Sequence, residues 1–268
     1  MPSYSLEYPK EPFSTVKRLS NRADYALETI HGIINSCQIL HVSYNVPDSP
    51  FPVIIPMLGQ MGSFARPSAD LGDVLELYLH GYVSTRMANA SRKDSPEGGL
   101  PVCVAASHLD GLVLALTPFH HSCNYRSAVV FGRATVVEDP AEKVWATQLI
   151  TDGVLAGRWD NSRVPPTRAE MASTAVLRVT IASGSAKVRT GGPGDDREDE
   201  EDAALVGRTW TGVVPVYQTL GEPVASGYNK VERVPKYMAD YIRDTNEESK
   251  SYAVEAVHKV MVKKKTDD

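Results

Sequence analysis

The 268-residue sequence lacks the features that mark secreted and membrane proteins. Its three cysteines, at positions 37, 103 and 123, are an odd number at wide spacing, which does not suit a disulfide framework. No apolar run approaches the length of a membrane span. Residues 1–12 carry charged side chains and have no apolar core, so they do not resemble a signal peptide. We therefore expect a cytoplasmic protein that does not contact a membrane.

Positive charge is also scarce. The chain has 28 lysines and arginines against 33 aspartates and glutamates, a formal net charge of −5, and no long basic face. This balance argues against nucleic acid as the main partner. Hydrophobic residues make up 42% of the chain, which is enough for a real core.

Several catalytic motifs are absent as well. The sequence has no Gly-x-Ser-x-Gly elbow, and it has too few glycines near residue 81 for a phosphate-binding loop or a dinucleotide fingerprint. Potential metal ligands gather at His108, Asp110, His120, His121 and Cys123. Their spacing fits neither a His-x-x-x-His nor a Cys-x-x-Cys pattern, so we predict no metal site.

The patterns that are present predict a protein built mainly of β-strands. Predicted strands cover residues 39–44, 51–58, 74–80, 101–106, 112–116, 128–137, 175–182 and 209–217, and predicted helices cover 21–37, 84–90, 141–151 and 235–243, with another short helix starting at the capping-box pair Thr167 and Glu170. Gly81 is expected to end the third strand, and Asp110-Gly111 to form a tight turn. Many strands joined by hairpins indicate a mainly β, α+β domain centred on a barrel.

Two prolines divide the segment 51–58. Pro52 and Pro56 cannot donate to a strand ladder, so this segment is expected to be an edge strand that forms a hairpin with residues 39–44. A flat ligand lying on residues 53–56 would explain the interruption. An ordinary edge strand is the alternative.

The most distinctive stretch is 120–127, which reads HHSCNYRS and leads directly into an apolar run. This junction predicts that Asn124, Tyr125, Arg126 and Ser127 lie at the mouth of a buried strand. Donors at such a place can hold an anionic or heteroaromatic ligand. The alternative is a loop whose side chains only close one end of the barrel.

Two more cationic segments follow predicted strands. Ser84 and Arg86 open a helix, where free backbone N–H groups, the helix dipole and the arginine would all face one anion. Alternatively, Ser84 is only a helix cap. Lys187 and Arg189 follow another strand. Three cationic strand ends could converge on the phosphate of a flat cofactor, with Tyr125 against its ring, or they could be unrelated solvated cations.

The order of these segments resembles the pyridoxamine-5′-phosphate-oxidase-like family of FMN-binding split barrels, most of all its branch of nitroimidazole-resistance-type proteins. The matching segments are residue 18 with 21–23, 39–42, 52–57, 77–81, 124–132 and 187–191. The resemblance covers roughly residues 15 to 220. It rests on the joint order of the segments, because no single motif is decisive.

The resemblance implies a six-stranded split β-barrel with a few peripheral helices, which forms a homodimer and binds FMN in a cleft at the dimer interface. It suggests an N-terminal arm over residues 1–14, an FMN-binding domain over 15–220 with an acidic mobile loop over 191–206, and a C-terminal extension over 221–268. Carried over by position, Ile54, Ile55 and Pro56 would lie along the isoalloxazine edge, Leu79 and His80 would continue that wall, Ser84 and Arg86 would hold the phosphate, and Ser127 would face the ring or the ribityl chain. Tyr125, Arg126, Lys187 and Arg189 complete the expected cofactor-binding set.

The sequence departs from the family at two places that matter. In the oxidase proper, the strand at 53–58 carries a basic residue at each end, whereas this chain has Val53 and Leu58. Met87 also stands where a second basic residue would be expected after Arg86. These departures argue against oxidation of a vitamin B6 phosphate.

We therefore expect an FMN-dependent oxidoreductase that acts on a small organic molecule. His41, His80 and His120 are candidates for proton transfer, because an imidazole titrates near neutral pH. Two alternatives stay open. One is a non-catalytic flavin- or haem-binding protein, in which His80, His120 or His121 could be the axial ligand. The other is a cofactor-free enzyme that uses the same cleft.

Overall fold

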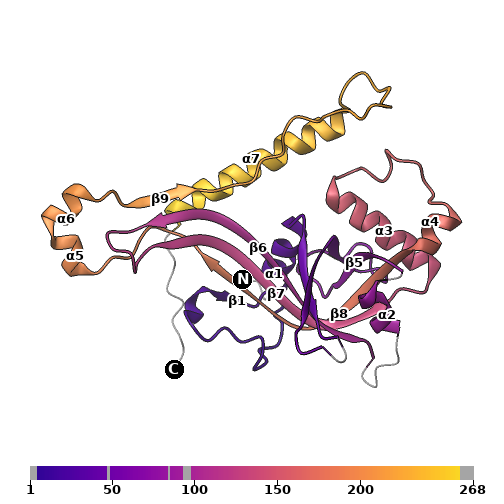
Figure 1. Ribbon diagram of the computed structural model, residues 1–268, viewed down its shortest axis with the longest axis horizontal. Helices are drawn as coiled ribbons and strands as arrows, with labels where there is room; N and C mark the ends of the chain where they lie inside the picture. The colour runs from indigo at the N-terminus through magenta and orange to yellow at the C-terminus, as the bar shows by residue number, and fades with distance from the viewer. Residues whose placement is uncertain (1–4, 47–48, 84, 93–97, 260–268) are drawn as a thin grey trace. The chain divides into compact units, whose positions relative to one another are not determined.

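The computed structural model describes residues 5–46, 49–83, 85–92 and 98–259. Within these residues, nine strands form one sheet in the order β3-β2-β6-β7-β8-β5-β4, with β1 paired to β8 and β9 paired to β6 (Figure 1). The strands are β1 (Ala23–Asp24), β2 (Leu40–Tyr44), β3 (Val53–Met57), β4 (Gly59–Gly62), β5 (Glu76–Tyr82), β6 (Leu100–Leu114), β7 (Ser122–Val136), β8 (Thr174–Arg189) and β9 (Gly212–Pro215). The predicted α+β class is confirmed. The count of six strands is not, because the described sheet has nine strands and an open path from β3 to β4.

Seven α-helices accompany the sheet in the described part of the chain. They are α1 (Leu27–Ser36), α2 (Arg86–Arg92), α3 (Pro140–Val154), α4 (Arg168–Ser173), α5 (Arg197–Glu201), α6 (Ala203–Arg208) and α7 (Lys236–His258), and a short 3-10 turn spans Ser20–Arg22. None of the helices in the described part of the chain is long and apolar enough to cross a bilayer.

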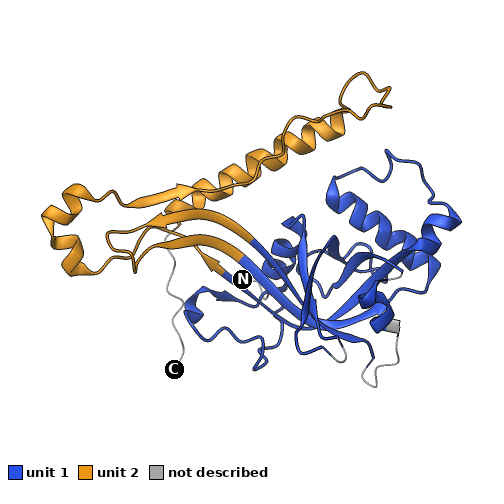
Figure 2. Cartoon of the chain, viewed as in Figure 1, with its two compact units in different colours: residues 1–107, 127–187 blue, residues 108–126, 188–268 orange. Residues whose placement is uncertain are grey.

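The chain divides into two compact units, which are coloured separately in Figure 2. Unit 1 comprises residues 1–107 and 127–187, and unit 2 comprises residues 108–126 and 188–268. The long strands β6, β7 and β8 contribute residues to both units. The segment 59–71 supplies β4 at one end of the sheet path.

The core of unit 1 lies on both faces of the sheet at β5 and β8. Leu40 and Val42 of β2 and Leu77 and Leu79 of β5 are fully buried, together with residues of α1 such as Ile30. Helix α3 covers another apolar cluster made by Tyr78, Val137, Ala146, Ile150 and Val176. Leu77, Tyr78 and Leu79 are consecutive and all buried, so β5 is covered by apolar residues on both faces.

Local capping chemistry explains where the helices of unit 1 begin. Asp139 accepts a hydrogen bond from the backbone N–H of Ala141 and so starts α3, while Thr167 and Glu170 form the predicted capping box of α4. The predicted start of α1 at residue 21 is wrong. Residues 23–24 pair with β8 as β1, so the helix can only begin at Leu27.

The predicted tight turn at Asp110-Gly111 is also wrong, because both residues lie inside the continuous strand β6. Gly111 pairs with Pro215 of β9, and a Cβ atom at this glycine would lie 2.8 Å from Cγ1 of Val213. The glycine therefore allows close packing of two strands instead of a turn. Similarly, Gly81 lies within β5 and does not end it.

The helices of unit 2 cover more of the chain than the sequence predicted. The acidic segment 191–206 contains α5 and the start of α6, and the Asp202 carboxylate accepts hydrogen bonds from the N–H groups of Ala204 and Leu205. Helix α7 continues to His258, well past the predicted end at residue 243. Ala253 and Ala256 near its C-terminal end are buried.

Candidate functional site

An exposed apolar strip lies along β3 and the residue that follows it in unit 1. Ile54 (63% exposed), Pro56 and Leu58 (38% exposed) alternate with half-buried residues, as expected for a strand with one outward face. The strip is defined here as these three residues. β3 stands at the end of the sheet path and pairs with β2 on one side, which confirms the predicted hairpin and the predicted edge strand.

Two histidines flank the apolar strip. His41 is exposed and directly opposite Pro56, so both side chains lie on the same face of the β2–β3 pair. The backbone N–H of His80 donates to the carbonyl of Leu58 over 2.9 Å, and its side chain is exposed at the other end of the strip. Although exposed, the His80 ring is partly desolvated by surrounding protein atoms, which lowers its pKa. A neutral imidazole can coordinate a metal or exchange a proton.

The structure separates Leu79 from this surface. Its side chain is 0% exposed and points into the core beside Leu40, so it cannot form the ligand wall that the resemblance implied. Ile55 is half-buried. Only the outward positions of the predicted segment are therefore open to a ligand.

One residue of the predicted phosphate site at the start of α2 is accessible to solvent. Arg86 is exposed at the first position of the helix. Ser84 lies outside the described residues. Its neighbour Thr85 supplies a cap, since Thr85 Oγ1 accepts a hydrogen bond from the N–H of Ala88 over 3.1 Å.

Ser127 and Lys187 meet between β7 and β8, still within unit 1. The hydroxyl of Ser127 donates to the carbonyl of Lys187 over 3.2 Å, and Lys187 Nζ donates to the carbonyl of Arg18 over 2.8 Å. This lysine therefore holds the N-terminal segment against the sheet. Ser127 is not at the strand mouth that the sequence suggested, because residues 124–127 lie inside β7, and Lys187 lies within β8 instead of following a strand.

The other two predicted cations belong to unit 2 and already have partners. Arg126 donates to both carboxylate oxygens of Asp110, over 2.8 and 3.1 Å, and its guanidinium lies 3.6 Å from the ring centre of Tyr252. Arg189 is buried and donates to Asn124 and to the carbonyl of Gly192. Tyr125, which stands between Asn124 and Arg126 in the sequence, is half-buried. The expected convergence of cationic strand ends on one anion is therefore absent from the contacts of the described residues.

A small pocket on the same face as the apolar strip was not foreseen from the sequence. It has a volume of about 230 Å³, and its lining includes Ser43, Cys103 and Phe131. Ser43 pairs with Ile54 on one side and with Cys103 on the other, so the pocket continues the exposed face of β3 and β2 onto β6. Burial raises the pKa of the Cys103 thiol, which keeps it protonated and unreactive near neutral pH. The alternation of residues 41–45 and 101–105, in which every second side chain points to the outer face of the sheet, is the signal that could have predicted this pocket.

The remaining candidate, His120, lies in unit 2 at the turn between β6 and β7. Its Nδ1 is 3.6 Å from Oδ1 of Asp195, and its Nε2 is 3.9 Å from Oδ2 of Asp196. His121, next to it, accepts a hydrogen bond at Nδ1 from the N–H of Ala115 over 3.0 Å. These two histidines are thus in an acidic and mainly polar environment, unlike His41 and His80.

The open sheet, its exposed proline-bearing end strand and the helix that follows β5 define an α+β protein of the split-barrel class. The family described as Pyridoxamine 5'-phosphate oxidase matches residues 27–188, more than half of the chain. The chain belongs to this family, which confirms the resemblance seen in the order of its segments.

Solved structures extend the similarity beyond the family segment. The flavocytochrome Anf3 of Azotobacter vinelandii is 30% identical, covers 88% of this chain and 99% of its own, and has a TM-score of 0.71. An FAD- and haem-binding protein of Mycobacterium smegmatis is 27% identical, covers 82% of this chain and 97% of its own, and has a TM-score of 0.67. No curated protein sequence matches the chain.

Proposed function

We propose that this protein is a redox protein that binds a flavin and a haem. The observation that carries the proposal is the 30% identity to a flavocytochrome over 88% of this chain, which extends well past residues 27–188. The second relative is described as binding both FAD and haem, so we favour FAD over the FMN expected from the sequence. A flavin exchanges one or two electrons and a haem iron exchanges one.

The apolar strip fits the flat ring of a flavin. Ile54 and Pro56 present exposed apolar surface, and Pro56 has no N–H that a further strand could use. Arg86 is exposed and offers a guanidinium for a phosphate group. Arg126 and Arg189 do not fit this role, because each is held by partners within unit 2.

His41 and His80 are the candidates we favour as haem ligands. Both are exposed at the border of the apolar strip, so either imidazole is available to a haem iron while the strip itself is assigned to the flavin ring. The lowered pKa of His80 favours the neutral ring that can coordinate iron. The carboxylates beside His120 would repel haem propionates, which makes that residue less suitable.

An absorption spectrum of the purified chain, produced with riboflavin and haem in excess, tests this proposal. We expect flavin bands and a haem Soret band, and chromatography of the denatured supernatant should identify FAD. Arg86→Ala should weaken flavin binding roughly tenfold or more, since a charge-assisted phosphate contact is lost. The matched control is Arg168→Ala, which removes an exposed arginine from the first position of another short helix, α4.

Histidine variants locate the haem. His41→Ala or His80→Ala should abolish the Soret band, whereas His258→Ala at the exposed end of α7 should leave it unchanged. Loss only in His120→Ala or His121→Ala would refute the placement beside the apolar strip. A protein that binds flavin without haem and turns over with a nicotinamide donor would favour the flavin-dependent oxidoreductase acting on a small molecule. A protein that binds neither group would refute the proposal, and light scattering would test the expected homodimer.

A further inference from the structure

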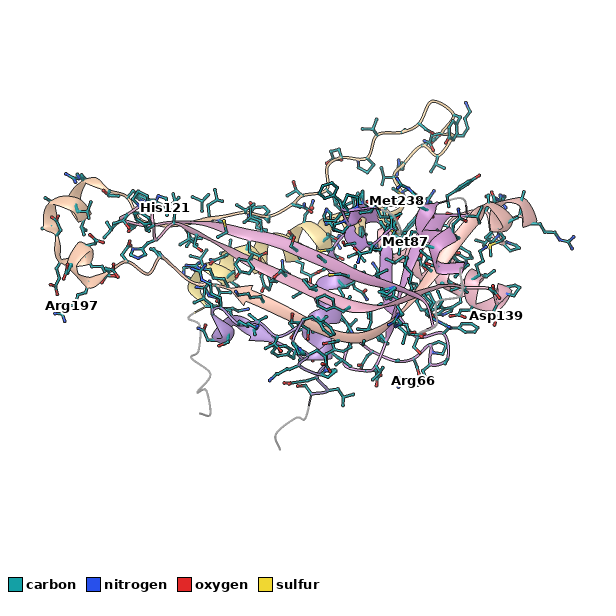
Figure 3. The ribbon with its side chains drawn as sticks, turned by 60° about the horizontal axis from the view of Figure 1, so that its bottom comes forward. Arg66, Met87, His121, Asp139, Arg197 and Met238 are labelled. Atoms are coloured by element: carbon teal, nitrogen blue, oxygen red, sulfur yellow. The ribbon has the colours of Figure 1, made fainter. Side chains whose placement is uncertain are left out.

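Two separate segments of unit 2 place one imidazole and two carboxylates together. His120 comes from the turn between β6 and β7, and Asp196 and Asp199 come from the start of α5. One potential ligand atom from each of these residues lies within 4.8 Å of the other two. In Figure 3, the labelled neighbours His121 and Arg197 mark these two segments at the same end of unit 2. We call these three residues the imidazole–carboxylate cluster.

The two segments are fixed to each other by an independent contact. The carboxylate of Asp195 accepts a hydrogen bond from the backbone N–H of Leu116 over 2.9 Å, and its side chain is only 5% exposed. The turn itself is closed by the N–H of His120, which donates to the carbonyl of Thr117 over 3.2 Å. The cluster therefore rests on a defined backbone framework.

Both ring nitrogens of His120 have polar neighbours. Thr117 Oγ1 lies 3.3 Å from Nδ1, and Oδ1 of the buried Asp195 lies 3.6 Å from the same nitrogen. The other nitrogen, Nε2, faces Asp196, whose Oδ2 is 3.9 Å away. The ring is thus held on its Nδ1 side and presents Nε2 to the carboxylates of the cluster.

Asp196 is also unusual for its position. It is the N-cap residue of α5, where an aspartate normally accepts a hydrogen bond from the backbone of the first turn. Here its side chain makes no such bond, and Oδ2 lies 3.9 Å from Nε2 of His120. The carboxylate is thus directed to the cluster instead of the helix.

Nearby positive charge does not neutralise the cluster. Among the residues that the structure describes, no lysine or arginine forms an ion pair with Asp195, Asp196 or Asp199, and Arg197 pairs with Glu201. Carboxylates brought together without a cation raise each other's energy, and a bound cation would remove this cost.

We propose that His120, Asp196 and Asp199 bind a divalent transition-metal ion such as Zn²⁺. One imidazole and two carboxylates suit this class, whereas Mg²⁺ and Ca²⁺ prefer all-oxygen ligands. Three protein ligands leave at least one position for water. The ion would tie the β6–β7 turn to α5 and stabilise unit 2 by mass action.

Titration calorimetry of the tag-free, chelator-treated full chain with Zn²⁺ tests the site. We expect one ion per chain with a micromolar dissociation constant, and the Co²⁺ form should show visible d–d bands. His120→Asn, Asp196→Asn and Asp199→Asn should each weaken Zn²⁺ binding by about tenfold or more and remove the Co²⁺ bands.

The matched control is Glu200→Gln, which removes the same charge from an exposed residue of α5 outside the cluster. It should change Zn²⁺ affinity by less than about threefold, since exposed charges are strongly screened. An equal loss in this control, displacement of Zn²⁺ by equimolar Mg²⁺, or no binding up to about 1 mM Zn²⁺, which is the weak end of specific affinity, would each overturn the proposal. Circular dichroism of each variant separates loss of the site from loss of the fold. The outcome does not depend on whether the chain binds flavin or haem.

Discussion

Replacing Asp110 by asparagine should loosen unit 2 at the junction of β6, β7 and α7. Asp110 and Arg126 form a two-pronged ion pair, with side chains that are 5% and 19% exposed. Removing one partner of a buried pair leaves the other charge desolvated without compensation. This typically costs 3–5 kcal/mol, and because Arg126 retains some contact with water we expect about 3 kcal/mol.

Hydrogen exchange can measure this effect where it occurs. The N–H of Val216 donates to the carbonyl of Asp110 over 3.1 Å, so its protection reports on the strand that carries the ion pair. A loss of about 3 kcal/mol corresponds to roughly 100-fold faster exchange of this amide. Asp244→Asn, which removes an exposed partner of Arg243 on α7, should leave the rate within about twofold.

A double variant separates the ion pair from other effects of the substitution. Asp110→Asn combined with Arg126→Met removes both charges, so it should cost less than the sum of the two single changes. An increase in exchange of less than about threefold in Asp110→Asn, or strictly additive single changes, would refute the view that this pair holds unit 2 together.

Three further predictions concern unit 1. Tyr8→Phe should reduce the free energy of unfolding by about 1–3 kcal/mol, because the Tyr8 hydroxyl donates to Nε2 of the buried His31 over 2.7 Å; an unchanged urea midpoint would contradict this. Desolvation lowers the pKa of His31 in the folded state, so the unfolded chain binds its proton more readily. Stability should therefore fall as the pH drops below about 6.5, and His31→Gln should flatten the pH dependence of the urea midpoint. Gly132→Ala should lower the melting temperature, because its Cβ would lie 2.4 Å from the carbonyl oxygen of Thr180, whereas Gly32→Ala in α1 should raise it through helix propensity.

Elements whose cause is local could be predicted from the sequence. The β2–β3 hairpin, the start of α3 at Asp139-Pro140 and the capping box of α4 each follow from residues within a few positions of one another. Pro52 and Pro56 also predicted an edge strand, because the missing N–H groups restrict the strand wherever it folds.

Distant partners decided the elements that could not be predicted. Asp110-Gly111 is a strong local turn signal, but the aspartate pairs with Arg126 and the glycine packs against Val213 of β9. These contacts form only in the folded sheet, and together they keep β6 continuous through a sequence that favours reversal. Likewise, no local pattern shows that residues after 243 continue α7, since its buried side chains there are only Ala253 and Ala256.

The same argument applies to the candidate site. The sequence indicated which residue types could bind a phosphate, but not which of these side chains the fold leaves exposed to a ligand. Arg86, Arg126 and Arg189 are equivalent in the sequence as possible phosphate ligands. In the fold, Arg126 is neutralised by a buried carboxylate and Arg189 is buried among the backbone carbonyls it binds, while Arg86 is exposed. A guanidinium that has lost its water to protein partners must break those contacts before it can hold a phosphate, and each charge-assisted bond so broken costs about 1.5–3 kcal/mol. Anion binding by this chain should therefore depend on Arg86 far more than on either of the other two arginines.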